Sequence, residues 1–202
     1  MKTKFWVIGF FFLGFAGCLF ANHYGIFKLS NVTEYQPPAF TKKHVDSMVK
    51  FAKERDFNEH IGIFINLRKH SGSNRFFLVD LDRQKALLAG LCCHGRGSEG
   101  YSEKARFSNT IGGNYSSQGF YKIGYKYNGT FGTAYKLHGL SATNSNAFER
   151  FVVLHGHECV PSTPVPVSIC QSLGCPTLSP EVLKELEPYL DKSKKPVLLW
   201  IY

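Results

Sequence analysis

From Ile61 to the end of the chain, short apolar runs alternate with clusters of turn residues, and this pattern limits the fold more than any other feature. Apolar runs of a few residues bounded by Gly, Pro, Ser or Asn are typical of strands rather than helices. A region rich in Gly, Ser, Asn and Tyr, residues 95–132, carries many further turn signals. The predicted strands cover residues 61–67, 76–81, 85–93, 151–155 and 197–201. The sequence therefore predicts a mostly β domain with a few helices.

The predicted helices have recognisable starts. Thr41 is a suitable N-cap for an amphipathic helix that ends near Phe57, because the apolar residues between them recur at i, i+3, i+4 and i+7. The segment Ser179-Pro180-Glu181 supplies an N-cap, a proline at the first helical position and an acid in the first turn of a second helix. We expect a further short helix to begin at Ser145.

The first 21 residues differ in composition from the rest. Lys2 and Lys4 form a basic start, and residues 5–20 contain no charge. An apolar run of this kind is typical of a secretory signal and short for a membrane-spanning helix. The residues before Cys18 also resemble a lipobox, in which Cys18 would carry the lipid, and an uncleaved anchor is a third alternative. We expect a signal peptide or lipoprotein leader over residues 1–21, and a linker with the amphipathic helix over residues 22–57.

Composition narrows the class of protein. The chain has 202 residues, of which 19% are charged and 44% hydrophobic, and its formal net charge is +9. These values exclude wholesale disorder and a multi-spanning membrane protein. The positive net charge favours binding to anionic partners such as cell-wall polymer or a membrane surface. Because an exported chain without a concentrated basic run is a poor nucleic-acid binder, we expect no nucleic-acid partner.

Six cysteines could belong to a disulfide framework, a metal cluster or a thiol catalyst, and their count alone does not decide between these. Cys175 differs from the others because Gly174 precedes it and Pro176 follows it, which places it on a constrained turn. His155 ends an apolar run and is followed by Gly156. Strand ends are places where a rigid scaffold presents side chains to a site, so these residues are candidates for chemistry.

Cys175 and His155 together predict a nucleophilic pair. A neighbouring imidazole would lower the pKa of the thiol, increase its thiolate fraction at neutral pH and then protonate a leaving amine. Backbone N–H groups at Gly174 and Cys175 are candidates to hold a developing oxyanion, and Ser172 is a candidate to brace the loop. The residues alone leave two alternatives open, a disulfide-bonded Cys175 and a purely structural His155.

A metal site is another alternative. It would use His155 and His157, with Glu158, His138 and His94 as further ligands. No helix-spaced pair and no Cys-x-x-Cys pair supports it. The glycine-rich segment that begins at His94 lacks the lysine of a phosphate-binding loop, so it is better explained as a turn beside the site. We therefore expect no metal and no cofactor.

The motifs and their order resemble the bacterial L,D-transpeptidase catalytic domain family, and in particular its murein L,D-transpeptidase branch. The signature is His155-Gly156 followed, after a gap, by Ser172-x-Gly174-Cys175. An ordered series of this kind is far more specific than one motif, and it covers most of residues 45–180. The other matching segments are residues 77–81, 94–98, 107–109, 117–121, 138–140, 146–147 and 153–156.

This resemblance implies a β-sandwich-like catalytic domain over residues 58–202. It implies Cys175 as the nucleophile and His155 as its base, with the backbone carbonyl of Gly156 orienting the imidazole. Ser172 and Gly174 would then support the loop, and His94 and His138 are candidates to lie behind the catalytic pair.

The implied substrate is the tetrapeptide stem of peptidoglycan. Cys175 would attack the carbonyl of the L-centre of the third residue and release the terminal D-alanine. The acyl group would then pass to an amine, giving a 3–3 cross-link, or to water. We expect a monomer in the bacterial cell envelope, in the periplasm, with Cys18 lipid or a retained leader as the candidate membrane attachment.

The sequence also departs from the family pattern. Leu173 stands before Gly-Cys, where many members carry His or Arg. Cys159 and Cys170 flank the loop that leads to the nucleophile, and we predict that they form a disulfide that stiffens it while the nucleophile stays free. The vicinal pair Cys92-Cys93 has no assigned role.

Two other kinds of protein share some of these features. Sortases also carry His before Cys, but with a longer gap and a later essential arginine, and no arginine follows Cys175 here. From a different class, a non-catalytic peptidoglycan-binding module remains the alternative to an enzyme.

Overall fold

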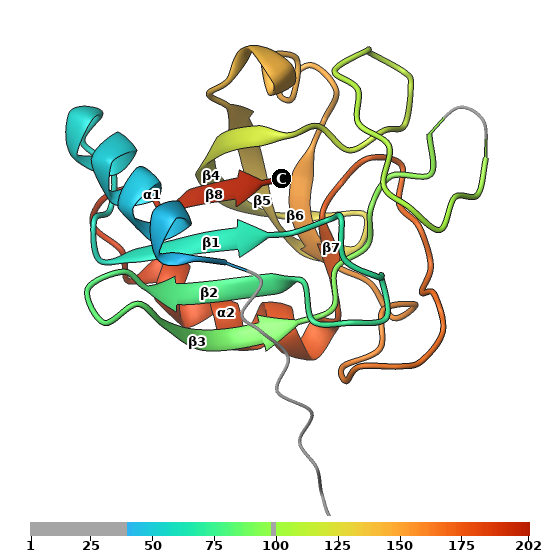
Figure 1. The fold of residues 1–202 in the computed structure, drawn as a ribbon. Helices are drawn as coiled ribbons and strands as arrows, with labels where there is room; N and C mark the ends of the chain where they lie inside the picture. Colours follow the sequence, from blue (N-terminus) through green and yellow to red (C-terminus); the bar gives the residue numbers. More distant parts are fainter. Residues whose placement is uncertain (1–39, 98–99) are drawn as a thin grey trace, which may run out of the picture. The chain divides into compact units, whose positions relative to one another are not determined.

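Eight strands form one sheet in the order β3-β2-β1-β8-β4-β5-β6-β7 (Figure 1). The structure, a computed structural model, describes residues 40–97 and 100–202. The predicted leader, with Cys18, and the predicted linker up to residue 39 lie outside the described residues. The strands are β1 (Ile61–Ile65), β2 (Phe76–Asp80), β3 (Lys85–Gly90), β4 (Gly119–Gly129), β5 (Gly132–Gly139), β6 (Val153–Gly156), β7 (Thr177–Leu178) and β8 (Leu198–Ile201). The helices are α1 (Lys42–Glu54), the 3-10 helix η1 (Ala142–Asn144) and α2 (Pro180–Asp191).

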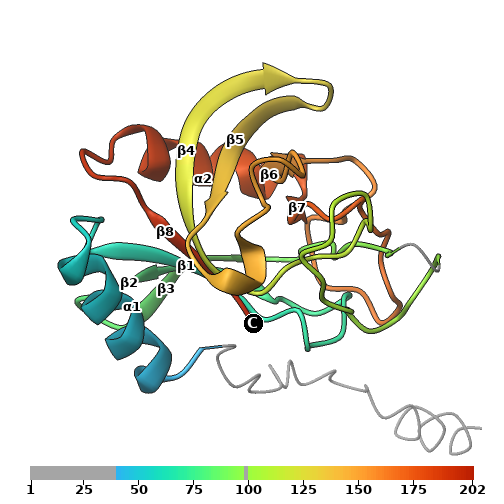
Figure 2. The ribbon, with the colours of Figure 1, turned by 90° about the horizontal axis from the view of Figure 1, so that it is seen from above.

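β1 and β2 are continuously apolar because both of their faces are covered. Along β1, Ile63 and Ile65 belong to a core shared with β4, β5, β6 and α2. Phe64 points to the opposite face, where it packs in a second core with residues of α1. Figure 2 shows β4 and β5 curving away from β1, β2 and β3, so the two halves of the sheet enclose the first core between them. The predicted mostly β, sandwich-like fold with a few helices is confirmed.

The five predicted strands are present, whereas the prediction for residues 95–132 is corrected. All of β4 lies in this region, and the sequence analysis does not predict β5 or β7 either. In β4 only Tyr121 and Ile123 are buried, and residues 125–128 are exposed, so no apolar run marks the strand. β4 and β5 pair antiparallel out to Gly129 opposite Gly132, and the backbone ladder therefore forms this long hairpin without a continuous apolar signal.

Both long helices begin where their caps predict. The Thr41 hydroxyl accepts a hydrogen bond from His44 N at 3.4 Å, and His44 Nδ1 accepts one from Thr41 N at 3.0 Å, which closes a capping box at the start of α1. Ser179 Oγ accepts from Val182 N at 3.2 Å at the start of α2. No helix in the described part of the chain is long and apolar enough to cross a membrane.

The prediction of a short helix that begins at Ser145 is wrong. The 3-10 helix η1 ends at Asn144, and turns follow it. Asn144 Oδ1 accepts from Ser141 N, and Asn144 Nδ2 donates to Phe120 O on β4, both at 2.9 Å. The buried amide therefore ties this turn to the sheet and competes with a regular helix.

A buried arginine joins the first hairpin to the segment that follows β3. The side chain of Arg75 is fully buried, and its Nε donates to Cys92 O at 2.6 Å and its Nη1 to Lys69 O at 3.2 Å. Its Nη2 lies 2.9 Å from Nδ1 of His94. No carboxylate pairs with it among the residues that the structure describes, and burial lowers its pKa. Neutral acceptors therefore solvate this charge, which makes the guanidinium a fixed connection between three backbone segments.

We predict that Arg75→Leu lowers the free energy of unfolding by about 3 kcal/mol or more, because it leaves several buried acceptors without a donor. Urea denaturation followed by circular dichroism measures this. The control Arg83→Leu replaces an exposed arginine and should change the free energy of unfolding by no more than about 0.5 kcal/mol. A loss below about 1 kcal/mol for Arg75→Leu would contradict the assigned role.

Candidate active site

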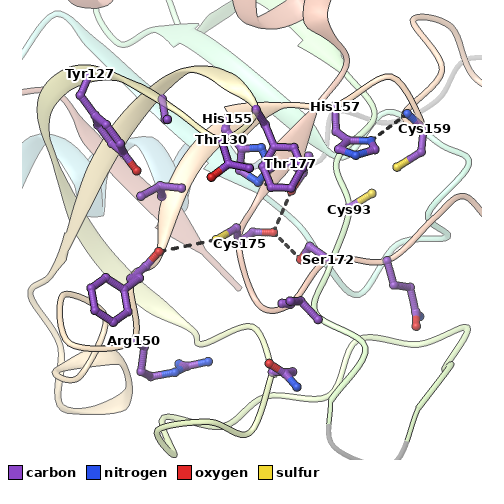
Figure 3. A pocket seen from close by; sticks show the side chains of 18 residues that line it. Cys93, Tyr127, Thr130, Arg150, His155, His157, Cys159, Ser172, Cys175 and Thr177 are labelled. Carbon is purple, nitrogen blue, oxygen red and sulfur yellow. Dashed lines mark hydrogen bonds between the residues drawn. The ribbon is translucent and has the colours of Figure 1, made fainter.

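β6 and β7 bring the two sequence-predicted residues to the same edge of the sheet. The strands are parallel neighbours with His155 opposite Thr177, and Cys175 lies just before β7. Figure 3 shows His155, Thr177 and Cys175 close together. His155 and Cys175 both line a cavity of about 520 Å³.

Backbone hydrogen bonds hold the loop that carries Cys175 against the segment after β3. Ser172 N donates to His94 O at 2.9 Å, and Cys93 N donates to Thr177 O at 2.8 Å. One bond lies before the cysteine in the chain and the other after it. The position of Cys175 is therefore set by main-chain pairing with a neighbouring segment.

His94 and His138 lie outside the cavity. Neither is among the described residues that line it. His94 is buried below the Cys175 loop, where burial and the Arg75 guanidinium lower its pKa to about 4, so its ring is neutral. His138 lies on β5 and stacks on Phe148 with the ring centroids 5.1 Å apart. His94 therefore supports the loop from behind, whereas His138 packs on an aromatic ring away from the candidate pair.

Ser172 closes the turn before Cys175 with one hydroxyl group. Its Oγ donates to Cys175 O at 2.6 Å and accepts from Gly174 N at 3.1 Å. Gly174 has φ of +118°, and a Cβ at this position would lie 2.9 Å from Tyr115 O. Only glycine meets both the conformation and the space that this turn requires.

This turn leaves one of the two expected oxyanion donors, the N–H groups of Gly174 and Cys175, already engaged. The N–H of Gly174 is already bonded to Ser172 Oγ, because the loop turns back on itself there. The N–H of Cys175 has no acceptor among the described residues. Cys175 N–H is therefore the donor of the two that a substrate oxygen could use.

His155 is held as a neutral imidazole with a defined tautomer. Its Nδ1 lies 3.0 Å from Gly156 O, and because a carbonyl only accepts, Nδ1 carries the proton. Nε2 lies 3.1 Å from the Thr177 hydroxyl. Phe131, at the tip of the β4–β5 hairpin, stacks on the ring with the centroids 5.1 Å apart. Burial lowers the pKa of His155, so Nε2 is unprotonated and accepts the hydrogen bond from the Thr177 hydroxyl.

The Cys175 thiol is free and protonated at neutral pH. Its Sγ donates a weak hydrogen bond to Phe151 O at 3.8 Å. Burial raises its pKa, while a backbone hydrogen bond from Val153 and the nearby Lys136 and Arg150 act in the opposite direction. The predicted lowering of the thiol pKa by His155 is thus wrong for the resting site, because the imidazole bonds to Thr177 and burial outweighs the nearby positive charges.

Lys136 and Arg150 place two positive charges near Cys175 that the sequence analysis did not find. Lys136 Nζ donates to Phe148 O at 3.2 Å and lies 5.1 Å from the centroid of the Phe151 ring. Arg150 Nη1 donates to Ser108 O at 3.0 Å. Within the described residues neither side chain has a carboxylate partner. Neither Lys136 nor Arg150 belongs to a linear motif, so only the fold shows that they lie near Cys175. Lys136, for example, pairs with Val153 across β5 and β6.

The predicted disulfide between Cys159 and Cys170 and the predicted free Cys175 are confirmed. Cys92 and Cys93, which the sequence leaves unassigned, are also free thiols. The alternative metal site at His155 and His157 is not assembled, because the one group of three potential ligands in the described part of the chain is Cys93, Cys159 and Cys170.

We predict that Gly174→Ala distorts the Cys175 turn. Gly112→Ala is the matched control, because Gly112 also has positive φ but a Cβ there would meet no atom within 4 Å. Gly112→Ala should lose about 1 kcal/mol because of its left-handed backbone. Gly174→Ala should lose a further 1–2 kcal/mol or so by urea denaturation, because its φ lies farther from the conformations open to alanine and its Cβ would collide with Tyr115 O. Equal losses in the two variants would contradict the close approach.

We also predict that iodoacetamide alkylates Cys175 at a rate that keeps rising from about pH 7 to beyond about pH 9, because its thiol pKa lies above the ordinary value. Stopped reactions analysed by peptide mass spectrometry give the rate at each pH, and Cys175→Ala gives the background from other thiols. A rate that is already at its plateau near neutral pH would instead indicate a preformed thiolate–imidazolium pair.

A family model agrees with the resemblance that the motifs carry. The family model of the L,D-transpeptidase catalytic domain matches residues 33–202. Among solved structures, the L,D-transpeptidase from Xylanimonas cellulosilytica is 15% identical, with a TM-score of 0.37 over 76% of this chain and 68% of that chain. The helical cell shape determining protein Pgp2 from Campylobacter jejuni is 13% identical, with a TM-score of 0.44 over 82% of this chain and 56% of that chain. No curated protein matches the chain significantly. Because the family model covers most of its length, the chain belongs to the L,D-transpeptidase catalytic domain family.

Proposed function

We propose that the protein is a cysteine-dependent peptidoglycan L,D-transpeptidase or L,D-carboxypeptidase that acts on tetrapeptide stems through an acyl-enzyme on Cys175. The observation that carries the proposal is that a free Cys175 thiol and His155 line the same cavity. Membership of the L,D-transpeptidase catalytic domain family supports the reaction class.

In the first step, Cys175 Sγ attacks the carbonyl carbon of the third stem residue. The S–C bond forms, the amide C–N bond to the terminal D-alanine breaks, and the thiol proton passes through His155 Nε2 to the leaving amine. The Thr177 hydroxyl has two acceptors within reach, since it lies 3.1 Å from His155 Nε2 and 3.3 Å from Cys175 O. A rotation of that hydroxyl frees Nε2 to accept the proton.

Negative charge that develops on sulfur and on the carbonyl oxygen would meet fixed positive charge. Lys136 and Arg150 act on Cys175 in the direction that stabilises its thiolate. Cys175 N–H is the backbone donor still without an acceptor among the described residues. Such preorganised groups stabilise the transition state more than a neutral resting site, which is how they would accelerate the reaction.

The cavity walls suit a peptide with a carboxylate end. Tyr127, Phe131, Phe151 and Leu173 supply apolar surface. Arg150 also lines the cavity and has no acidic partner in the described structure, so it is suited to a substrate carboxylate. In the second step an amine of another stem, or water, attacks the thioester and releases Cys175. The amine gives a 3–3 cross-link and water gives a tripeptide.

We propose a place in the bacterial cell envelope for this activity. The basic start and apolar run of residues 1–21 support export. Cleavage of this leader, lipidation at Cys18 or retention of the leader as an anchor would each leave the catalytic domain beside its peptidoglycan substrate.

The test is incubation of purified muropeptides with wild type, Cys175→Ala and His155→Gln, with the products identified by mass spectrometry. We predict 3–3 dimers or tripeptides with wild type, no product with Cys175→Ala, and a rate about 100- to 10,000-fold lower with His155→Gln. The control His60→Gln changes an exposed histidine paired with Asp82 and should keep the wild-type rate.

Two results would contradict the proposal. Turnover by Cys175→Ala at the wild-type rate would exclude the acyl-enzyme on this residue. Stem peptides bound by a folded wild type that forms neither product would instead indicate a non-catalytic peptidoglycan-binding module.

A further inference from the structure

Three cysteine sulfurs meet beside the cavity, apart from the Cys175–His155 pair. Cys159 and Cys170 form the disulfide, and Cys93 Sγ lies 3.2 Å from Cys170 Sγ. All three sulfur atoms lie within 4.8 Å of one another. Cys93 and Cys159 are among the residues that line the cavity, and Figure 3 shows both with His157 at one end of it. The chain thus holds a third cysteine, as a free thiol, in contact with its disulfide.

The protein scaffold fixes the two sulfurs that face each other. Cys93 is held by its backbone bond to Thr177 and is buried. Cys170 follows Ile169, whose N–H donates to the buried Ser71 hydroxyl at 3.1 Å. Cys93 Sγ also donates to Cys170 O at 2.8 Å. The contact therefore follows from the positions of two anchored segments.

We propose that Cys93, Cys159 and Cys170 form a thiol–disulfide exchange site, in which Cys93 replaces Cys159 as the partner of Cys170. The Cys93 thiolate attacks Cys170 Sγ, and a Cys93–Cys170 bond forms as the Cys159–Cys170 bond breaks. Cys159 leaves as a thiolate and takes up the proton that Cys93 lost. The exchange is an isomerisation, so it requires neither an oxidant nor a reductant.

Burial makes Cys159–Cys170 the resting pairing. Cys93 is buried, and burial raises its pKa to about 12, so it is protonated and slow to attack at neutral pH. Cys159 is exposed, so water can stabilise its thiolate as it leaves. Once released, Cys159 presents a thiol in the cavity wall that small disulfides and electrophiles can modify.

The exchange changes one wall of the cavity while the nucleophile loop keeps its backbone contacts. Cys159–Cys170 closes only its own loop, whereas Cys93–Cys170 would tie that loop to the segment on which the Cys175 loop already docks. Residues 160–169 would lose their covalent closure. A thiophilic metal ion could bind the same three sulfurs only after the disulfide had been reduced, whereas exchange starts from the disulfide that the structure contains.

The first test traps the released thiol. The chain carrying Cys175→Ala is incubated natively with excess iodoacetamide and no reductant, quenched in acid and mapped by peptide mass spectrometry. We predict one alkyl group on Cys159 together with a Cys93–Cys170 disulfide. In the control that adds Cys93→Ser, Cys159–Cys170 should stay intact and unmodified. An intact Cys159–Cys170 bond after Cys93 itself has been alkylated would overturn the proposal. The readout needs no turnover, so it is independent of the proposed reaction.

The second test removes the resting partner. Cys159→Ser in the same background, oxidised in air, should form a Cys93–Cys170 disulfide, and adding Cys92→Ala should leave that bond in place. Free thiols at both Cys93 and Cys170 in a folded variant would contradict the exchange site. Zinc retained by the reduced chain, without any exchange product in the first test, would overturn the proposal in favour of a metal site.

Discussion

The main-chain pairing between residues 93–96 and residues 172–177 is the interaction on which the candidate site depends. It positions Cys175 through backbone hydrogen bonds at Ser172 and Thr177. Beneath it, the buried Arg75 holds the segment after β3 by bonding to Cys92 O and to the His94 ring. A short loop is thereby fixed relative to β6, which carries His155. Without this pairing the two residues would share a sequence motif but no common geometry.

In the proposed mechanism, Cys175 becomes charged during the reaction rather than before it. Cys175 and His155 are both shifted toward their neutral forms, because each is desolvated. Lys136 and Arg150 stay near the thiol without acidic partners in the described structure. Such a site holds its positive charge in place until a substrate supplies the negative charge, which is the arrangement that favours transition-state stabilisation over ground-state binding.

Local features can be predicted from the sequence, whereas features that depend on residues far apart in the chain cannot. The caps at Thr41 and Ser179 and the apolar strands follow from short segments. The motif singles out Cys175 and His155, but pairing between distant segments places them at one cavity. The β4–β5 hairpin was missed because its outer half buries nothing. The thiol pKa was predicted with the wrong sign because burial is set by residues far away in the chain. The contact of Cys93 with Cys170 was likewise invisible, since folding brings two distant segments together.

The central claim is an acyl-enzyme on Cys175, and intact-protein mass spectrometry tests it most directly. Wild type mixed with a tetrapeptide stem and quenched in acid should gain the mass of the tripeptide acyl group, with the adduct mapped to Cys175 and absent from Cys175→Ala. The same adduct on another residue, or product formation by wild type without any Cys175 adduct at any quench time, would contradict the account.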